Sequence, residues 1–236
     1  MGQHLSPRGS EYFILGTLDD YMGRQLDPRD TNLLDRYYAN EGALVNILDT
    51  FLKRTYPTVT YKVDRYKDTK GNPLSFKIFS ELLTRRLNAY YNFYPSGSYL
   101  SPGHEAILIG RLKASAFTTD EQKMAFLAGA WVRFGFSNDT AYLISVANSA
   151  SKARVCTQLL KDLHCRVSYQ IMTDYIPVGH HVYFHPSPEV RAFLAKYRFM
   201  RKKVQVASDA YFKKMFRDAA NASAKGSGNS NDSKPH

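Results

Sequence analysis

The chain has 236 residues, 44% of them hydrophobic, so it can build one large domain or two small ones that share a core. No run of 18 apolar residues occurs, which excludes a membrane-spanning helix. Lys and Arg number 32 against 21 Asp and Glu, a net charge of +11, and aromatic residues make up 14%. This balance favours a polyanion partner, nucleic acid first, although a basic enzyme with a solvated charged face remains an alternative.

Two cysteines, Cys156 and Cys165, are too few for a disulfide framework, so we expect a reducing compartment. The first residues, MGQHLSPRGSEY, lack the apolar core of a secretory signal. Residues 200–236 hold eight Lys or Arg and three Asp, a net charge of +5. Their last stretch, AKGSGNSNDSKPH, has the composition of a disordered tail.

Hydrophobic spacing and turn residues divide residues 10–94 into helices and strands. Leu44, Ile47, Leu48 and Phe51, for example, follow the i, i+3, i+4, i+7 rule of an amphipathic helix. In chain order the patterns predict a helix over 10–23 with Ser10 as its N-cap, a strand over 33–39, a helix over 41–55, strands over 58–66 and 74–79, and a helix from Ser80 to about Tyr94.

Residues 118–199 repeat this order. The patterns predict a helix from a capping box of Thr118 and Glu121 to about Gly135, a strand over 141–147, a helix over 150–164, paired strands over 166–172 and 180–185, and a helix that starts at Ser187-Pro188. An extra basic helix is expected over 205–221. The repeat is one of pattern and predicts two α+β halves related by a pseudo-twofold axis.

The stretch FLAGAWVRFGF, residues 126–136, carries small residues at close helical spacing. Leu127–Gly135 aligns without a gap to the nine-letter signature of the LAGLIDADG homing endonucleases, and it resembles that signature in its first three letters and its final glycine. The flanking stretches YYNFYPSGSYLSP, FTTDEQKMAFLAGAW and YLISVANSASKARVCTQLLKDLHC resemble the single-chain, two-repeat branch of the family, which includes intron maturases. The resemblance covers residues 10–199. A tightly packed core helix of another fold is the alternative.

The resemblance implies an α+β fold of two pseudo-symmetric αββαββα-type halves. Their signature helices would pack at the pseudo-twofold axis, and antiparallel sheets would form a saddle around duplex nucleic acid. We expect an N-terminal segment at 1–9, a first half at 10–110, a second half at 111–200, and a basic helix and polar tail at 201–236.

The family's nuclease chemistry needs an acidic residue at the end of each signature helix, because the metal ions require hard oxygen ligands beside the reacting phosphate. The resemblance places the metal-binding acid of the second motif on Phe134, directly after Arg133. The first motif, ILGTLDDYMG, keeps Asp19 and Asp20, but in a shifted register. These four residues would be vestiges of an active site, so we expect no nuclease activity and no cofactor.

Other candidate residues share the predicted saddle face or extend beyond it. Phosphates would pair with its Lys and Arg, and splayed bases would stack on its Tyr and His, while a solvated strand or helix face is the alternative. The strand set is Lys62, Tyr66, Lys77, Arg166, Ser168, Gln170, His181, Tyr183 and His185. The basic set near the C-terminus is Arg201, Lys202, Lys203, Lys213, Lys214 and Arg217. Arg133 joins both as a cation at the centre of the saddle.

The histidine cluster of residues 180–185 lacks convincing third and fourth zinc ligands, so we expect no metal site there. Taken together, the sequence predicts a catalytically inactive, LAGLIDADG-derived RNA-binding protein. The preferred role is a structural rRNA-binding subunit of a mitochondrial ribosome, in the matrix, beside RNA and neighbouring proteins, with no membrane and no small-molecule substrate. A maturase-like group I intron splicing cofactor, a DNA-binding regulator and a still active or nicking endonuclease are the alternatives.

Overall fold

The computed structural model of the chain describes residues 6–100, 106–138 and 140–226. Its first half runs α1 (Pro7–Thr17), β1 (Arg24–Leu26), β2 (Leu33–Tyr38), α2 (Gly42–Thr55), β3 (Lys62–Lys67), β4 (Pro73–Phe79) and α3 (Glu81–Asn88). Its second half runs α4 (Asp120–Phe134), β7 (Gly135–Ser137), β8 (Tyr142–Ala147), α5 (Ala150–Asp162), β9 (Arg166–Met172), β10 (Gly179–His185) and α6 (Pro188–Ala195). The expected αββαββα order therefore occurs twice.

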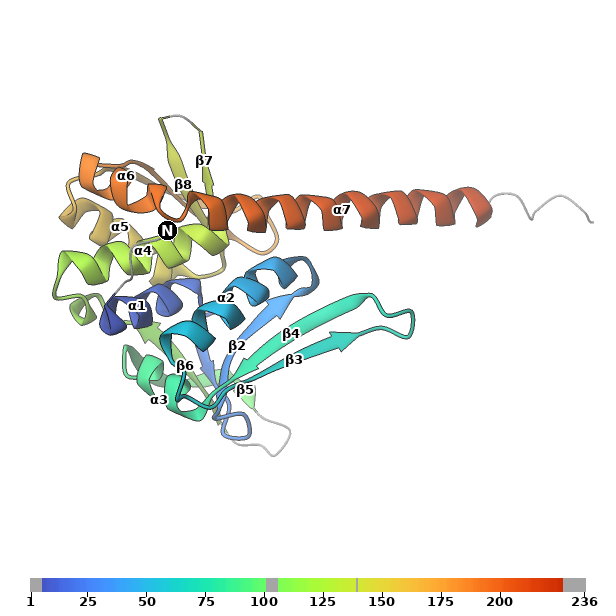
Figure 1. Cartoon of the computed structure of the whole chain (residues 1–236), viewed down its shortest axis with the longest axis horizontal. Helices are drawn as coiled ribbons and strands as arrows, with labels where there is room; N and C mark the ends of the chain where they lie inside the picture. The colour runs from blue at the N-terminus through green and yellow to red at the C-terminus, as the bar shows by residue number, and fades with distance from the viewer. Residues whose placement is uncertain (1–5, 101–105, 139, 227–236) are drawn as a thin grey trace, which may run out of the picture.

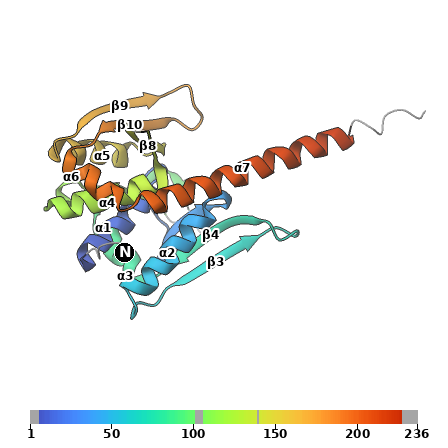
Figure 2. The ribbon, with the colours of Figure 1, turned by 45° about the horizontal axis from the view of Figure 1, so that its top comes forward.

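Two further strands lie between the halves, β5 (Tyr91–Leu100) and β6 (Ala106–Leu112), and a long helix, α7 (Arg198–Gly226), follows the second half. All strand pairs are antiparallel, in three sheets with the orders β7-β8-β10-β9, β2-β4-β3 and β1-β6-β5. The sheets of the two halves lie on opposite sides of the central helices (Figures 1 and 2). Among the described residues no helix is long and apolar enough to cross a membrane.

Helices α1 and α4 pack against each other at the centre of the molecule, as Figure 1 shows. A Cβ atom on Gly16 would lie 2.0 Å from the carbonyl oxygen of Phe126, and one on Gly129 would lie 2.0 Å from that of Phe13. Each phenylalanine precedes its own glycine by three residues, so the two contacts are equivalent. This reciprocity is what a pseudo-twofold axis between two helices produces, and it explains why both positions hold glycine.

Several sequence-based boundaries were wrong. α1 begins with Ser6 as its N-cap, whose hydroxyl accepts from the amide of Gly9, and it ends at Thr17, because Leu18 is already extended. Asp19 and Asp20 therefore lie beyond the helix. The capping box of α4 is formed by Thr119 and Gln122, one residue later than expected.

The helix expected to reach Tyr94 ends at Asn88, and Tyr91 starts strand β5, which pairs with β6. β1, β5, β6 and β7 were not predicted. α7 is one continuous helix from Arg198 rather than a separate one over 205–221, and the strand expected over 58–66 begins at Lys62. The domain boundaries stay predictions, and most of the polar tail lies outside the described residues.

Candidate nucleic-acid interface

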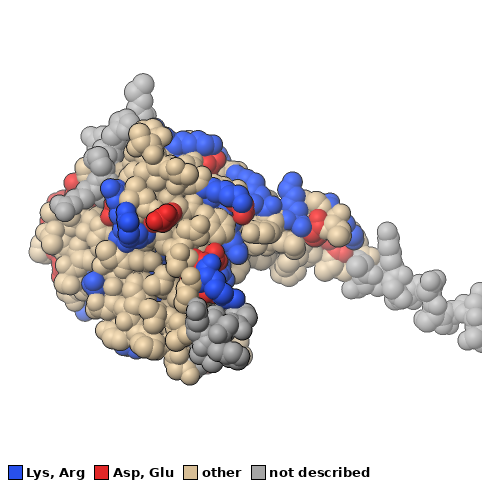
Figure 3. Space-filling view, turned by 90° about the horizontal axis from the view of Figure 1, so that it is seen from below, with Lys and Arg blue, Asp and Glu red and all other residues tan. Residues whose placement is uncertain are grey.

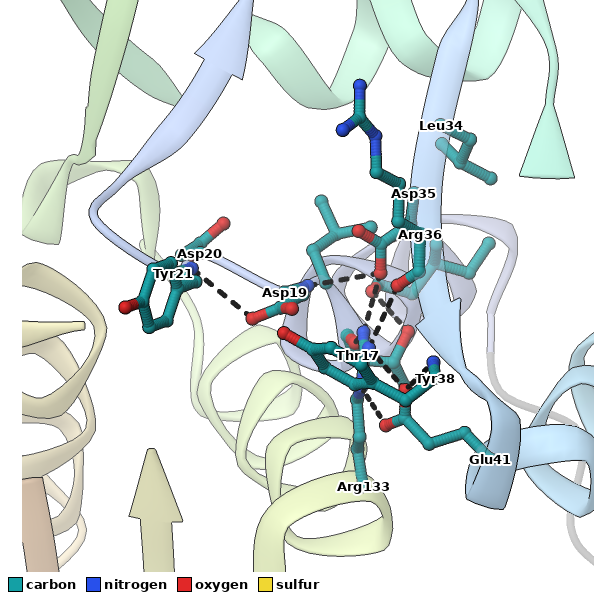
Figure 4. A network of polar contacts seen from close by, with 12 residues as sticks. Thr17, Asp19, Asp20, Tyr21, Leu34, Asp35, Arg36, Tyr38, Glu41 and Arg133 are labelled. Atoms are coloured by element: carbon teal, nitrogen blue, oxygen red, sulfur yellow. Dashed lines mark hydrogen bonds and ion pairs between the residues drawn. The ribbon is translucent and has the colours of Figure 1, made fainter. Parts of the chain in front are cut away.

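Arg133, on the last turn of α4, lies inside the molecule rather than on the saddle surface, with its side chain 0% exposed. Its Nη1 donates to Oδ2 of Asp35 at 2.6 Å, and its Nε donates to Oε1 of Glu41 at 2.7 Å (Figure 4). It also donates to the carbonyl oxygens of Thr17 and Arg36, at 2.7 Å and 2.9 Å. The prediction that Arg133 contacts nucleic acid is therefore wrong for this structure, because all the N–H groups of its guanidinium already donate hydrogen bonds within the protein.

The ionisation of this cluster follows from its burial. Desolvation raises the pKa of Asp35 to about 6, although the Arg133 guanidinium opposes the rise. Burial alone would lower the pKa of Arg133, but the carboxylates of Glu41 and Asp35 outweigh burial and hold that pKa well above its ordinary value. Arg133 thus stays charged and binds together α4, β2 and the end of α1.

Asp20 belongs to a second buried cluster, on the other side of the end of α1. Its carboxylate accepts from the hydroxyl of Tyr91 at 3.0 Å and lies 3.4 Å from Nζ of Lys152, a residue of α5. Lys152 is fully buried and also donates to the carbonyl oxygens of Gly16, at 3.2 Å, and Leu18. The carboxylate of Asp20 is therefore paired with a lysine of this chain.

Cationic side chains bind the carbonyl oxygens at the C-terminal ends of both central helices, α1 and α4. Arg133 and Lys152 bind the last carbonyl oxygens of α1, and Nη1 of Arg201 donates to the carbonyl oxygens of Val132 and Arg133 at the end of α4. The negative end of a helix dipole favours cations, so this is a stabilising arrangement. Arg201, like Arg133, is buried, so its predicted contact with nucleic acid is also wrong for this structure.

The facing glycines fix the register that the sequence left open. In the sequence, Phe134 is the fifth residue after Gly129 and Tyr21 is the fifth after Gly16. α4 is helical up to Phe134 whereas α1 ends at Thr17, so the count is one along the sequence and not a match of positions in space. Neither residue is a carboxylate. Within the described part of the chain no group of three or more His, Cys, Asp or Glu could hold a metal ion. The metal that the fold family implies therefore does not fit the residues present.

The predicted strand residues do share faces. In β9 and β10, Arg166 pairs with His185, Ser168 with Tyr183 and Gln170 with His181. In the first half, Lys77 of β4 lies opposite Asp64 and Arg36, and Tyr66 lies opposite Ser75. Nζ of Lys77 lies 5.6 Å from the ring centre of Tyr66, a cation–π contact. All members of the strand set are at least partly exposed, and their contact with nucleic acid stays a prediction.

Two residues of the first-half face were missed, Arg36 and Tyr38 of β2, both exposed and in register with Lys77 and Ser75. Alternation within the predicted strand over 33–39 could have found them. Lys152 could have been found as well, since it lies four residues before Cys156 on the apolar face of its helix. No pattern in the nearby sequence indicates that Asp35 and Glu41 bind Arg133.

Five members of the predicted basic set are exposed on α7, together with Arg198 at its start: Lys202, Lys203, Lys213, Lys214 and Arg217. Figure 3 shows Lys and Arg side chains along this helix and on the part of the body next to it. The helix extends away from both halves (Figures 1 and 2), and every described side chain from Phe212 to Asn221 is exposed.

Known structures match this geometry. A mesophilic variant of the homing endonuclease I-DmoI superposes with a TM-score of 0.50 and 12% identity, over 80% of this chain and 95% of that chain. The chain has the LAGLIDADG homing-endonuclease fold. An I-DmoI variant in complex with its target DNA and manganese gives a TM-score of 0.50 and 14% identity, over 81% of this chain and 93% of that chain.

Full-length DUF199/WhiA from Thermatoga maritima gives a TM-score of 0.48 and 11% identity, over 93% of this chain and 68% of that chain. No family model and no curated protein sequence matches the chain. The two I-DmoI superpositions establish the LAGLIDADG fold.

Proposed function

We propose that this protein binds nucleic acid through its LAGLIDADG fold without cutting it, and that its partner is the RNA of a mitochondrial ribosome. The observation that carries the proposal is the state of the two helix ends. Phe134 ends α4 where the resemblance calls for a metal-binding acid, and the carboxylates of Asp20 and Asp35 beyond the end of α1 are paired with Lys152 and Arg133. Metal-assisted cleavage needs a pair of acidic ligands, and Asp19 is the one carboxylate of this centre without an ion pair among the described residues.

The interface that remains suits a nucleic acid. Exposed Lys and Arg on the strands and α7 provide phosphate contacts, and the exposed rings of Tyr38, Tyr66 and Tyr183 are available to stack on unpaired bases. Unpaired bases are plentiful in folded RNA and rare in duplex DNA, which favours RNA.

Helix α7 supports a place within a large assembly. Its 29 residues span about 43 Å at 1.5 Å per residue, and its outer part exposes Phe212, Met215 and Phe216 at i, i+3, i+4 spacing. An amphipathic helix end without core contacts of its own is expected to pack against a neighbour. A ribonucleoprotein offers both phosphates for its basic residues and protein surfaces for its aromatic ones.

The loss of cleavage is tested by incubating the purified protein with supercoiled DNA and Mg²⁺. We expect no nicking. Metal-dependent nicking that disappears in Asp19→Asn or Asp20→Asn would overturn the proposal. Asp19→Asn is the cleaner variant, because Asp19 has no ion pair among the described residues, whereas Asp20→Asn also removes the partner of buried Lys152.

The ribosomal role is tested by sedimentation of the native protein from mitochondrial lysate after a high-salt wash. We expect it to sediment with ribosomal particles. Sedimentation as a free protein would contradict the ribosomal role and leave an intron-splicing role standing.

A further inference from the structure

A cavity of about 340 Å³ opens between β1 and β2, at the end of α1. We propose that it binds one unpaired nucleobase of the RNA partner, with a preference for bases that carry an amino group. This inference rests on the proposed RNA-binding function and names what one part of that interface recognises. The volume lies at the small end of the range of about 300–1,000 Å³ for ligand sites.

The cavity exists because the first half departs from the second in its strand pairing. In the second half β7 pairs directly with β8, whereas β1 pairs with β6 and β2 pairs with β4, so the facing edges of β1 and β2 stay apart. Arg24 of β1 bridges them, since its Nη1 donates to the carbonyl oxygen of Leu34 at 2.8 Å and its Nε donates to Asn88 at 2.7 Å. Because Arg24 is buried and hydrogen-bonded to β2 and to Asn88, it holds the two strands at this separation.

Aromatic and hydrogen-bonding groups line this gap. Tyr38 is 59% exposed at its edge, and Tyr21 lies on the α1 side. Tyr37 also lines the cavity, but it is only 2% exposed and its hydroxyl is shielded within the protein, so Tyr38 provides the accessible ring.

Among the charged residues that line the cavity, the carboxylate of Asp19 disfavours a phosphate beside it. Of the four carboxylates in the lining, Asp27, Asp30 and Asp35 lie within 4.0 Å of Arg29, Arg36 and Arg133 respectively. Asp19 is the remaining one, without an ion pair among the residues the structure describes; its Oδ1 accepts from the amide of Tyr21 at 3.2 Å, and its carboxylate lies beside Tyr38 and accepts from that hydroxyl (Figure 4). A carboxylate has lone pairs for further N–H donors, and its negative charge repels an anion.

A neutral, flat ring with an amino donor suits both the exposed ring of Tyr38 and the carboxylate of Asp19. It stacks on Tyr38, as unpaired bases do on aromatic side chains, and it donates its exocyclic amino group to Asp19, as cytosine does to carboxylates. Adenine, cytosine and guanine have that amino group, whereas uracil presents carbonyl oxygens in its place. The expected order is therefore AMP, CMP and GMP above UMP.

The test is an NMR titration of the full chain with each of the four ribonucleoside monophosphates, using saturation transfer to identify the contacting protons. We expect stronger saturation of base than of ribose protons, and weaker binding of UMP. Tyr38→Ala should weaken binding about fivefold or more, since stacking on one base contributes about that much. Tyr38→Phe, which keeps the ring, and Tyr175→Ala, an exposed tyrosine outside the cavity, should bind as wild type does.

Asp19→Asn adds a donor where the acceptor stood and should move the preference toward UMP. Equal binding of all four nucleotides, or unchanged binding in Tyr38→Ala, would overturn the inference. If the protein binds no nucleotide, and binds a folded RNA equally well with and without the Tyr38 side chain, the base-binding cavity is refuted while the RNA-binding function stands. If the protein binds nucleotides but no RNA, the cavity is supported and the RNA-binding function is refuted.

Discussion

Replacement of Arg133 by methionine tests the assignment of this residue to the interior. The change keeps much of the side-chain volume but leaves the carboxylates of Asp35 and Glu41 buried without their cation. Removing one partner of a buried ion pair costs about 3–5 kcal/mol. Because Arg133 serves two carboxylates and two carbonyl oxygens, we expect the upper part of that range, against a total stability of about 5–15 kcal/mol for typical domains.

The loss of stability in Arg133→Met should become smaller as the pH falls. The folded pKa of Asp35, about 6, lies above its unfolded value of 3.8, so the folded state takes up this proton first and stability rises as the pH falls from about 6 toward 3.8. Without Arg133 the pKa of Asp35 rises further, because the charge that lowered it is gone. The variant therefore gains more from acidification, and the gap to wild type should narrow between pH 8 and pH 5.

Urea unfolding, followed by the fluorescence of the single, buried Trp131 on α4, measures both effects. Arg191→Met, an exposed change on α6, is the matched control and should alter stability by less than about 0.5 kcal/mol. A loss below about 1 kcal/mol at pH 7.5, or a gap that is the same at pH 8 and pH 5, would refute the structural role of Arg133.

Three further predictions concern the helix axis, the core and the interface. Gly129→Ala should lower stability by about 1–2 kcal/mol despite the better helix propensity of alanine, because the new Cβ meets the backbone of Phe13. Thermal unfolding measures this loss, and Gly97→Ala, whose Cβ meets nothing within 4 Å, is the control. Cys156, whose pKa burial raises to about 12, should resist alkylation at pH 8 until the protein is unfolded, and mass spectrometry of native and denatured samples decides this. Arg166→Ala should weaken RNA binding to a similar extent for all sequences and reduce the salt slope by about 1 in filter binding, and an unchanged slope would remove Arg166 from the interface.

The sequence carried the local part of the fold. Apolar spacing located α2 and α5 to within two residues of their ends, and alternation located β2, β8, β9 and β10. The small residues around Gly129 indicated close helix packing, which the contact with Phe13 confirms. These features depend on neighbours a few residues apart, and such patterns are visible in a sequence.

Long-range pairing decided the rest. Leu83, Leu87, Tyr90 and Tyr94 have helical spacing, but the chain leaves the helix after Asn88 because Tyr91 and its successors pair with β6. Arg133 looked like a surface cation because its partners Asp35 and Glu41 lie 98 and 92 residues earlier in the chain. The cavity between β1 and β2 arises from the same exchange of strand partners, so no local pattern could have shown it.

The central claim is binding of RNA without metal-dependent cleavage, and one competition experiment tests it directly. The purified protein is incubated in Mg²⁺ with a labelled, folded mitochondrial rRNA fragment and increasing amounts of duplex DNA at several salt concentrations, and the bound strands are recovered on a denaturing gel. The account predicts that the RNA stays bound, outcompetes the duplex and is recovered intact. Preferential binding of the duplex, or its recovery as cut strands, would contradict it.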